Sequence, residues 1–195
     1  MLLLHGNTVS PLCTWFDVVI FGEEWTTTSD YRTLTPELFQ LSNMGTGQLG
    51  PVVSFFAGLL YAQYPTARES SVTQSEVFGL SLIHNEYPYS GNAIELPGLQ
   101  MLWRATESFG TDAPDSEWIP YWRNPASDYP GGVAVSSYRK PDGRELLVLF
   151  NPAYREAEYD LSRWKQIRNA MDDNREVPEK RLRIEPRGFR LYLAE

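Results

Sequence analysis

The sequence has few of the residues that build disulfides and transition-metal sites. Its 195 residues include one cysteine and two histidines. A single cysteine excludes an intramolecular disulfide, and we interpret Cys13 as a small buried apolar residue rather than a nucleophile. The two histidines lie far apart and no paired cysteines accompany them, which argues against a zinc site. We therefore expect neither a metal nor a cofactor.

Long apolar runs and early basic clusters are also missing. No stretch approaches the ~20 apolar residues that cross a bilayer. The opening residues Met1–His5 lack a basic segment and are too short for the core of a signal peptide, so we interpret them as a buried strand. No cluster of lysine or arginine occurs before residue 123, which argues against nucleic acid as a partner. The sequence leaves the compartment open, and a longer form of the protein could be secreted.

Charge is unevenly divided along the chain. Residues 1–122 contain 3 basic and 13 acidic residues, while residues 123–195 contain 14 and 12, so the net charges are −10 and +2 and sum to −8. The hydrophobic content of 42% is enough to build a core. We predict two domains, residues 1–122 and residues 123–195.

The first part alternates strand and helix signals. Leu2–Leu4 and Trp15–Phe21 are short apolar and β-branched runs typical of buried strands. Thr35, Pro36 and Glu37 have the order of an N-cap, a first-turn proline and a first-turn acid. Such alternation predicts an α/β architecture with parallel strands.

Two further helices are predicted before residue 122. Thr73 and Glu76 have capping-box spacing before a mostly apolar segment that runs to Ile83. His84 and Asn85 follow it and are interpreted as a helix-terminal cap rather than as ligands. The second helix carries an apolar stripe closed by Gly110, and the stripe consists of Leu99, Leu102, Ala105 and Phe109.

The second part has the period of antiparallel strands. Val133–Tyr138 and Glu145–Phe150 flank a turn with proline, aspartate and glycine, which predicts a β-hairpin. Arg181–Ile184 and Gly188–Leu193 suggest a further strand pair, and only Trp164–Met171 competes as helix. We expect a small antiparallel β-sandwich domain.

Carboxylates near the strands of the first part are the leading candidates for chemistry. Active sites of α/β barrels lie at the carboxyl ends of the strands, and Asp17, Glu23 and Glu24 are placed to reach such an end. Within a strand from Trp15 to Phe21, the Asp17 side chain would be buried and would need a partner or a raised pKa. The alternative is that Asp17 is a structural acid and that the two glutamates belong to a solvated loop.

Polar and aromatic residues near the same strands could bind a sugar. His5 and Asn7 follow the first strand and could hydrogen-bond hydroxyl groups, Gln48 lies in a glycine-rich segment, and Trp25 offers a stacking surface. A structural role for His5, and a core role for any single aromatic residue, remain the alternatives. Neither a Gly-x-Ser-x-Gly elbow nor a phosphate-binding glycine loop with its lysine occurs.

These features together resemble one family. The order of short motifs is similar to the late barrel segment and following β-domain of glycoside hydrolase family 123 and its relatives. The residues that carry the resemblance are His5, Asn7, Phe16-Asp17, Gly22-Glu23, Tyr31, Leu34–Phe39, Gln48, Gly50, Glu117–Trp122, Val135–Tyr138, Leu149–Asn151 and Pro186–Phe189.

The resemblance implies part of a (β/α)8 barrel followed by a β-domain, with a carbohydrate as partner. It also implies hydrolysis of an O-glycosidic bond, including that of an N-acetylhexosaminide with the acetamido group as nucleophile. Characterised members use an adjacent Asp-Glu pair on an earlier strand, and this sequence contains no Asp-Glu dipeptide. A full barrel takes about 200–250 residues before any appended domain.

We therefore expect the C-terminal part of a glycoside hydrolase whose isolated chain is inactive. Its catalytic residues are unassigned; the best candidates are Asp17 and Glu23, with His5, Asn7, Glu24, Trp25 and Gln48 as substrate-binding residues. Exposed barrel edges would favour self-association. The alternatives are a non-catalytic carbohydrate-binding module and a structural protein whose aromatic residues are all core.

Overall fold

The computed structural model describes residues 3–5, 15, 18–21, 35–37, 40, 52–56, 74–89 and 97–195. The chain divides into two compact units, Met1–Glu95 and Leu96–Glu195. The predicted domain division after Trp122 remains a prediction. Within the described residues, no helix combines the length and the apolar character needed to cross a membrane.

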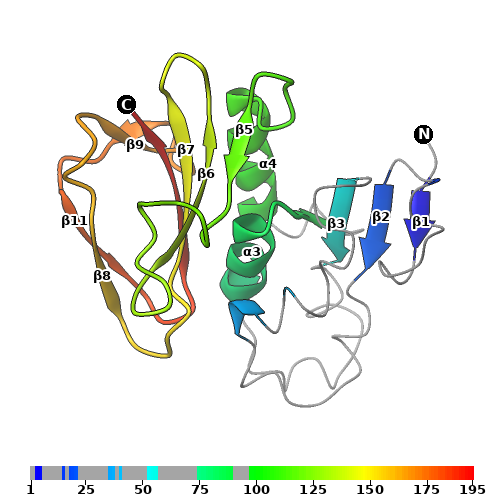
Figure 1. Ribbon diagram of the computed structural model, residues 1–195, viewed down its shortest axis with the longest axis horizontal. Coiled ribbons are helices and arrows are strands. Elements are labelled where there is room, and N and C mark those ends of the chain that lie inside the picture. Colours follow the sequence, from blue (N-terminus) through cyan, green and yellow to red (C-terminus); the bar gives the residue numbers. More distant parts are fainter. Residues whose placement is uncertain are drawn as a thin grey trace. The chain divides into compact units, whose positions relative to one another are not determined.

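The first unit contains a parallel four-stranded sheet. Its strands are β1 (Leu3–His5), β2 (Val18–Phe21), β3 (Val52–Phe56) and β4 (Tyr87–Tyr89), and they are neighbours in that order (Figure 1). All three strand pairs are parallel, which confirms the expected parallel arrangement.

The second strand begins later than its sequence suggested. Trp15 lies in a 3₁₀ turn and is 77% exposed, and the strand begins at Val18. Val18 pairs with Leu3 of β1 and with Val52 of β3, the first residues of those strands. The neighbouring strands, and not the apolar run, therefore determine where β2 begins.

Two helical segments of this unit follow their predicted signals. Pro36 and Glu37 are helical, and Thr35 precedes them as expected of an N-cap. Helix α3 (Gln74–Ile83) lies between β3 and β4 in the sequence. It is buried on most sides, since Phe78, Leu80 and Ile83 are all enclosed, as expected for a helix without a polar face.

The second unit begins with helix α4 (Pro97–Phe109). Its predicted stripe is buried and its end at Gly110 is confirmed by a positive φ of 73°. Gly110 N donates to Glu107 O and Thr111 N donates to Thr106 O, at 3.0 and 3.2 Å. This pair of bonds is the Schellman motif, which pairs the last carbonyls of a helix.

Two antiparallel sheets follow the helix. The larger has the order β10-β9-β12-β7-β6-β5 and the smaller pairs β11 with β8. The strand bounds are β5 Glu117–Ile119, β6 Ala134–Arg139, β7 Glu145–Phe150, β8 Ala157–Asp160, β9 Ile167–Asn169, β10 Arg175–Glu176, β11 Arg181–Ile184 and β12 Phe189–Ala194.

The predicted hairpin is confirmed as β6 and β7. Gly143 has a φ of 89°, and Gly143 N donates to Lys140 O at 3.0 Å. Ala134 through Arg139 pair with Phe150 through Glu145 in continuous register. Trp164–Met171, the segment that competed as helix, contains strand β9.

The second predicted strand pair is wrong in its pairing. Both strands exist, but β11 pairs with β8, whereas β12 pairs with β7 and β9. Asn151 supplies the physical reason, because its Nδ2 donates to Ile184 O and Glu185 O at 3.1 and 2.9 Å. These bonds hold the segment after β11 in a turn that carries the chain from one sheet to the other.

The core of the second unit lies between its two sheets. Buried residues from the larger sheet, among them Val135, Leu147 and Leu149, pack with Tyr159 of β8 and Ile184 of β11. Ser136, Val148 and Leu191, on the opposite face of the larger sheet, are buried as well. The predicted antiparallel sandwich is therefore present, and its larger sheet is covered on both faces.

Candidate functional site

The carboxyl ends of the parallel strands define the candidate site of the first unit. His5, the last residue of β1, is in register with Ile20 of β2, which is in register with Ser54 of β3. Ser54 in turn is in register with Tyr87 of β4. Because the strands are parallel, their carboxyl ends share one edge of the sheet.

The predicted site residues can be placed relative to these strands by their sequence positions. The backbone of His5 belongs to β1, whereas Asn7, Glu23, Glu24, Trp25, Gln48 and Asp17 lie outside the described residues. Asn7 follows β1 by two residues, and Glu23 follows β2 by two. Asp17 directly precedes Val18 and so comes at the amino end of β2 in sequence. In sequence position, Glu23 therefore follows the carboxyl end of β2 and Asp17 precedes its amino end.

A buried histidine follows α3 at the other end of β4. His84 is 1% exposed, and its Nδ1 lies 2.7 Å from Leu80 O. Burial lowers the pKa of His84 to about 4, so the ring is neutral near pH 7. Asn85 has a φ of 62°, and its N donates to Leu82 O. The predicted helix-terminal cap is thus confirmed.

Glu86, next along the chain, was missed by the sequence analysis. It is buried, and neither carboxyl oxygen has a hydrogen-bond partner among the residues that the structure describes. Burial raises the pKa of Glu86 well above its ordinary value. The only sequence signal was a charged residue between an apolar helix and an aromatic strand. Because it precedes β4, Glu86 lies at the amino end of the sheet, where barrels place residues for stability.

Aromatic residues at positions 118–129 pack mainly against one another. The Trp122 ring meets those of Trp118 and Tyr121 edge-on, with centroids 5.6 and 4.9 Å apart. Tyr121 is buried and its N donates to Ser136 Oγ at 2.9 Å, while Asn124 Nδ2 donates to Ser137 Oγ at 3.1 Å. This segment is therefore fastened to β6, and among these rings Trp122, 44% exposed, offers surface to solvent.

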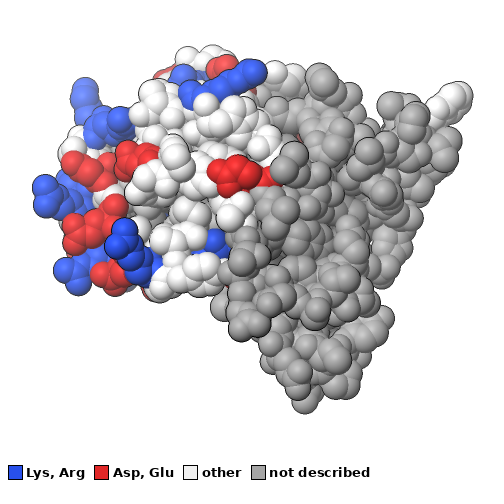
Figure 2. Space-filling model, turned by 60° about the horizontal axis from the view of Figure 1, so that its bottom comes forward, with Lys and Arg blue, Asp and Glu red and all other residues white. Residues whose placement is uncertain are grey.

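Charges of both signs are interspersed over the described part of the face shown in Figure 2. Arg190 pairs with Glu185 at 2.5 Å, and Arg183 lies 3.8 and 3.7 Å from Glu156 and Glu158. This part of the face has no continuous basic patch of the kind that binds polyanions. In the described residues there is also no group of three or more His, Cys, Asp or Glu side chains that could hold a metal ion.

Comparison with solved structures connects this architecture to glycosidases. No family model and no curated protein matches the sequence. A proposed alpha-galactosidase/melibiase of Bacteroides fragilis matches 92% of this chain with a TM-score of 0.56 and 9% identity. A second proposed alpha-galactosidase of that organism matches 99% with a TM-score of 0.56 and 13% identity.

These two similarities establish a likeness of fold. They run through both units, since nearly the whole chain is covered. The matched segments make up 42% and 46% of the two solved chains, so this chain spans less than half of their length.

Proposed function

We propose that this chain is the C-terminal part of a glycoside hydrolase, formed by the last strands of a (β/α)8 barrel and the β-domain that follows them. The observation that carries the proposal is the shared fold with two proposed alpha-galactosidases over 92% and 99% of the chain. The β-sandwich alone could not account for that coverage, because it begins after the parallel sheet.

The strand order of the first unit supports a barrel. Its strands are neighbours in sequence order, as in a (β/α)8 barrel. A doubly wound sheet reverses its order at a switch point, and no reversal occurs among the four described strands of this unit. β1 and β4 each pair with one strand in the described residues, so each leaves an edge that a further barrel strand, or another copy, would cover.

The carboxyl edge of the sheet is the proposed substrate side. Glu23 and Glu24 follow β2 there, and His5 and Asn7 end or follow the neighbouring β1. We assign them to substrate binding, with Trp25 and Gln48 as further contacts. Asp17 keeps its place as a candidate only if it reaches this edge.

The substrate class remains open between two glycosides. The two solved neighbours are proposed alpha-galactosidases, which favours an alpha-galactoside. The resemblance to glycoside hydrolase family 123 favours an N-acetylhexosaminide. The neighbours carry more weight because their similarity extends over the fold, whereas the family resemblance consists of short motifs.

The test is an assay of a longer protein encoded by the same reading frame, extended upstream by about 200 residues. We expect this longer protein to hydrolyse a nitrophenyl alpha-galactoside or N-acetylhexosaminide, and we expect the 195-residue chain alone to be inactive. Glu23→Gln in the longer protein should reduce kcat/KM at least tenfold, while Glu107→Gln, an exposed substitution on α4, should leave it unchanged.

Two results would contradict the proposal. One is a stop codon directly upstream, which would leave no room for the remaining barrel strands. The other is turnover by the 195-residue chain itself that Glu23→Gln abolishes, since that chain would then be a complete enzyme.

A further inference from the structure

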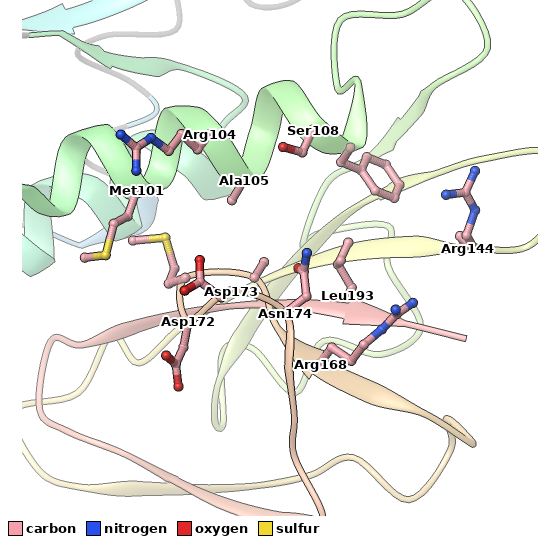
Figure 3. A pocket seen from close by; sticks show the side chains of 13 residues that line it. Met101, Arg104, Ala105, Ser108, Arg144, Arg168, Asp172, Asp173, Asn174 and Leu193 are labelled. Carbon is pink, nitrogen blue, oxygen red and sulfur yellow. The ribbon is translucent and has the colours of Figure 1, made fainter.

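We infer that a cavity in the second unit binds a neutral saccharide. The cavity has a volume of about 670 Å³ and is lined by residues of α4, β9, β12, the turn after β9 and the turn between β6 and β7 (Figure 3). Small-molecule sites commonly measure about 300–1,000 Å³. The cavity lies wholly within Leu96–Glu195 and is therefore a feature of the β-sandwich unit.

The charged groups of the cavity are nearly balanced. Arg168 is paired with Glu195 Oε1 at 2.5 Å, and Arg144 is paired with Asp142 at 2.7 Å. Arg104, Asp172 and Asp173 also line the cavity, and none of them forms an ion pair within the described part of the chain. One guanidinium and two carboxylates therefore remain for a ligand, which disfavours a strongly charged one.

These groups have the hydrogen-bonding capacity that sugar hydroxyls require. A hydroxyl group both donates and accepts, a carboxylate only accepts, and a guanidinium only donates. Arg104 comes from α4, while Asp172 and Asn174 come from the opposite wall (Figure 3). Hydroxyl groups at different positions of a saccharide can thus donate to the aspartates or accept from the arginine and the asparagine amide.

The remaining lining is apolar and would contact the C–H face of a sugar ring. Met101, Ala105 and Phe109 line the α4 side, and Met171 and Leu193 line the sheet side. Small-molecule sites commonly combine apolar side chains with a few polar groups that fix the orientation of the ligand. This combination matches a pyranose, which has apolar faces and a polar rim.

The turn that presents the acids is held by hydrogen bonds of its own residues. Asp173 and Asn174 have φ values of 43° and 58°, and Arg175 N donates to Asp172 O at 2.8 Å. Met171 N also donates to Asn169 Oδ1 at 3.0 Å. Asp and Asn suit consecutive positive φ values in such a turn. A rigid turn lowers the ordering cost of binding.

This inference goes beyond the proposed function because it needs no hydrolysis, although the choice of galactose as the probe rests on that function. The four methionines of the chain, Met1, Met44, Met101 and Met171, provide the readout. Two of them line the cavity. In the full chain labelled with ¹³C-methyl methionine, galactose should shift the Met101 and Met171 signals, which Met101→Leu and Met171→Leu assign.

Matched variants separate the cavity from the rest of the surface. Arg104→Ala and Asp172→Asn should each weaken galactose binding roughly tenfold or more, because each removes hydrogen bonds to a charged group. Arg123→Ala and Asp112→Asn change exposed residues of the same types outside the cavity and should leave binding unchanged. The methyl spectrum of each variant without sugar shows whether it is folded.

Three outcomes would overturn the inference. The first is the absence of any shift at Met101 and Met171, and the second is a shift at Met1 or Met44 alone. The third is a response to galacturonate but not to galactose, which would indicate an anion site. A longer protein that hydrolyses no glycoside would remove the proposed function and leave binding at this cavity intact.

Discussion

The two units differ in whether a tight turn joins any of their described strand pairs. In the first unit, residues 22–51 separate β2 from β3, and residues 57–86 separate β3 from β4. In the second, residues 140–144 separate β6 from β7, although residues 151–188 separate β7 from its other partner β12. Parallel pairing always requires such a long connection, and closing a long loop costs more conformational entropy than forming a tight turn.

The sheets of the two units also differ in how fully they are covered and paired. The larger sheet of the second unit is buried on both faces, whereas β1 and β4 of the first unit's sheet each pair with one strand in the described residues. We therefore expect the second unit to be the more stable of the two and to unfold in a separate transition.

The largest expected effect comes from two matched substitutions, each of which should shift the unfolding transition of one unit. Leu147→Ala in β7 and Leu80→Ala in α3 each remove a fully buried side chain, at a cost of about 3–5 kcal/mol. Leu147→Ala should lower only the transition of the second unit, and Leu80→Ala only that of the first. Denaturant titration followed by circular dichroism measures both. A single transition that moves in both variants would show that the units unfold together.

The next effect is a pH dependence confined to the first unit. The pKa of His84 falls from its ordinary 6.5 to about 4 on folding, so the unfolded state binds the proton more readily. Stability from neutral His84 is full above pH 6.5 and is lost as the pH falls towards 4, by about 3 kcal/mol in total. His84→Gln should flatten this decline. An equal decline in the variant would mean that other groups cause it.

Glu86 gives the stability of the first unit a pH dependence of the opposite sign. Its pKa is raised by burial, so its carboxyl group destabilises the fold as the pH rises above 4.5, the ordinary value. Glu86→Gln should therefore increase the stability of the first unit at pH 7, measured by thermal unfolding. A loss of stability at pH 7 would show that the charged carboxylate has a partner.

A smaller effect is expected at the turn after β11, where the chain passes from the smaller to the larger sheet of the second unit. Asn151 is fully buried; its Nδ2 donates to the carbonyls of Arg155, Ile184 and Glu185, and its Oδ1 accepts from Ala153 N. Asn151→Ala should cost about 2 kcal/mol, because buried carbonyls lose their partner. Asn124→Ala, which removes fewer bonds, should cost less in the same denaturation experiment.

The smallest effect concerns an ion pair between the buried side chain of Lys140 and the exposed side chain of Asp115. Lys140 Nζ donates to Asp115 Oδ1 at 2.6 Å and to Gly110 O at 3.0 Å, and the bond from Lys140 lowers the pKa of Asp115. The contribution of Asp115 is present above its ordinary pKa of 3.8 and is lost as the pH falls below it. Asp115→Asn should reduce stability slightly at low salt and less at 1 M salt, since solvent and ions screen the exposed carboxylate.

Local signals in the sequence were the ones that predicted structure well. The hairpin at Lys140–Gly143 and the helix end at Gly110 depend on residues a few positions apart, and both are confirmed. The pairing of β11 and β12 was wrong because it depends on Asn151, more than 30 residues before Ile184. The start of β2 was misplaced because it depends on the neighbouring strands.

The candidate sites, too, could be predicted from the sequence only where they depend on neighbouring residues in the chain. Glu23 was proposed from its position after a strand. The register shows that this strand is parallel to its neighbours, whereas Glu23 itself lies outside the described residues. The cavity of the second unit was not predicted, because Arg104 and Asp172 are far apart in the sequence and line one cavity only in the folded chain. Glu86 was missed because burial, and not sequence context, changes its chemistry.

The position of β12 in the larger sheet has a consequence for the order of folding. β12 lies between β7 and β9, although β9 precedes it in the chain. The β6–β7 hairpin can form early, but β9 and β10 have no place to attach until β12 has docked on β7. Until then β7 presents an open strand edge of the kind that pairs with other chains. The late arrival of Phe189–Ala194 is therefore the step at which nascent chains are most exposed to aggregation.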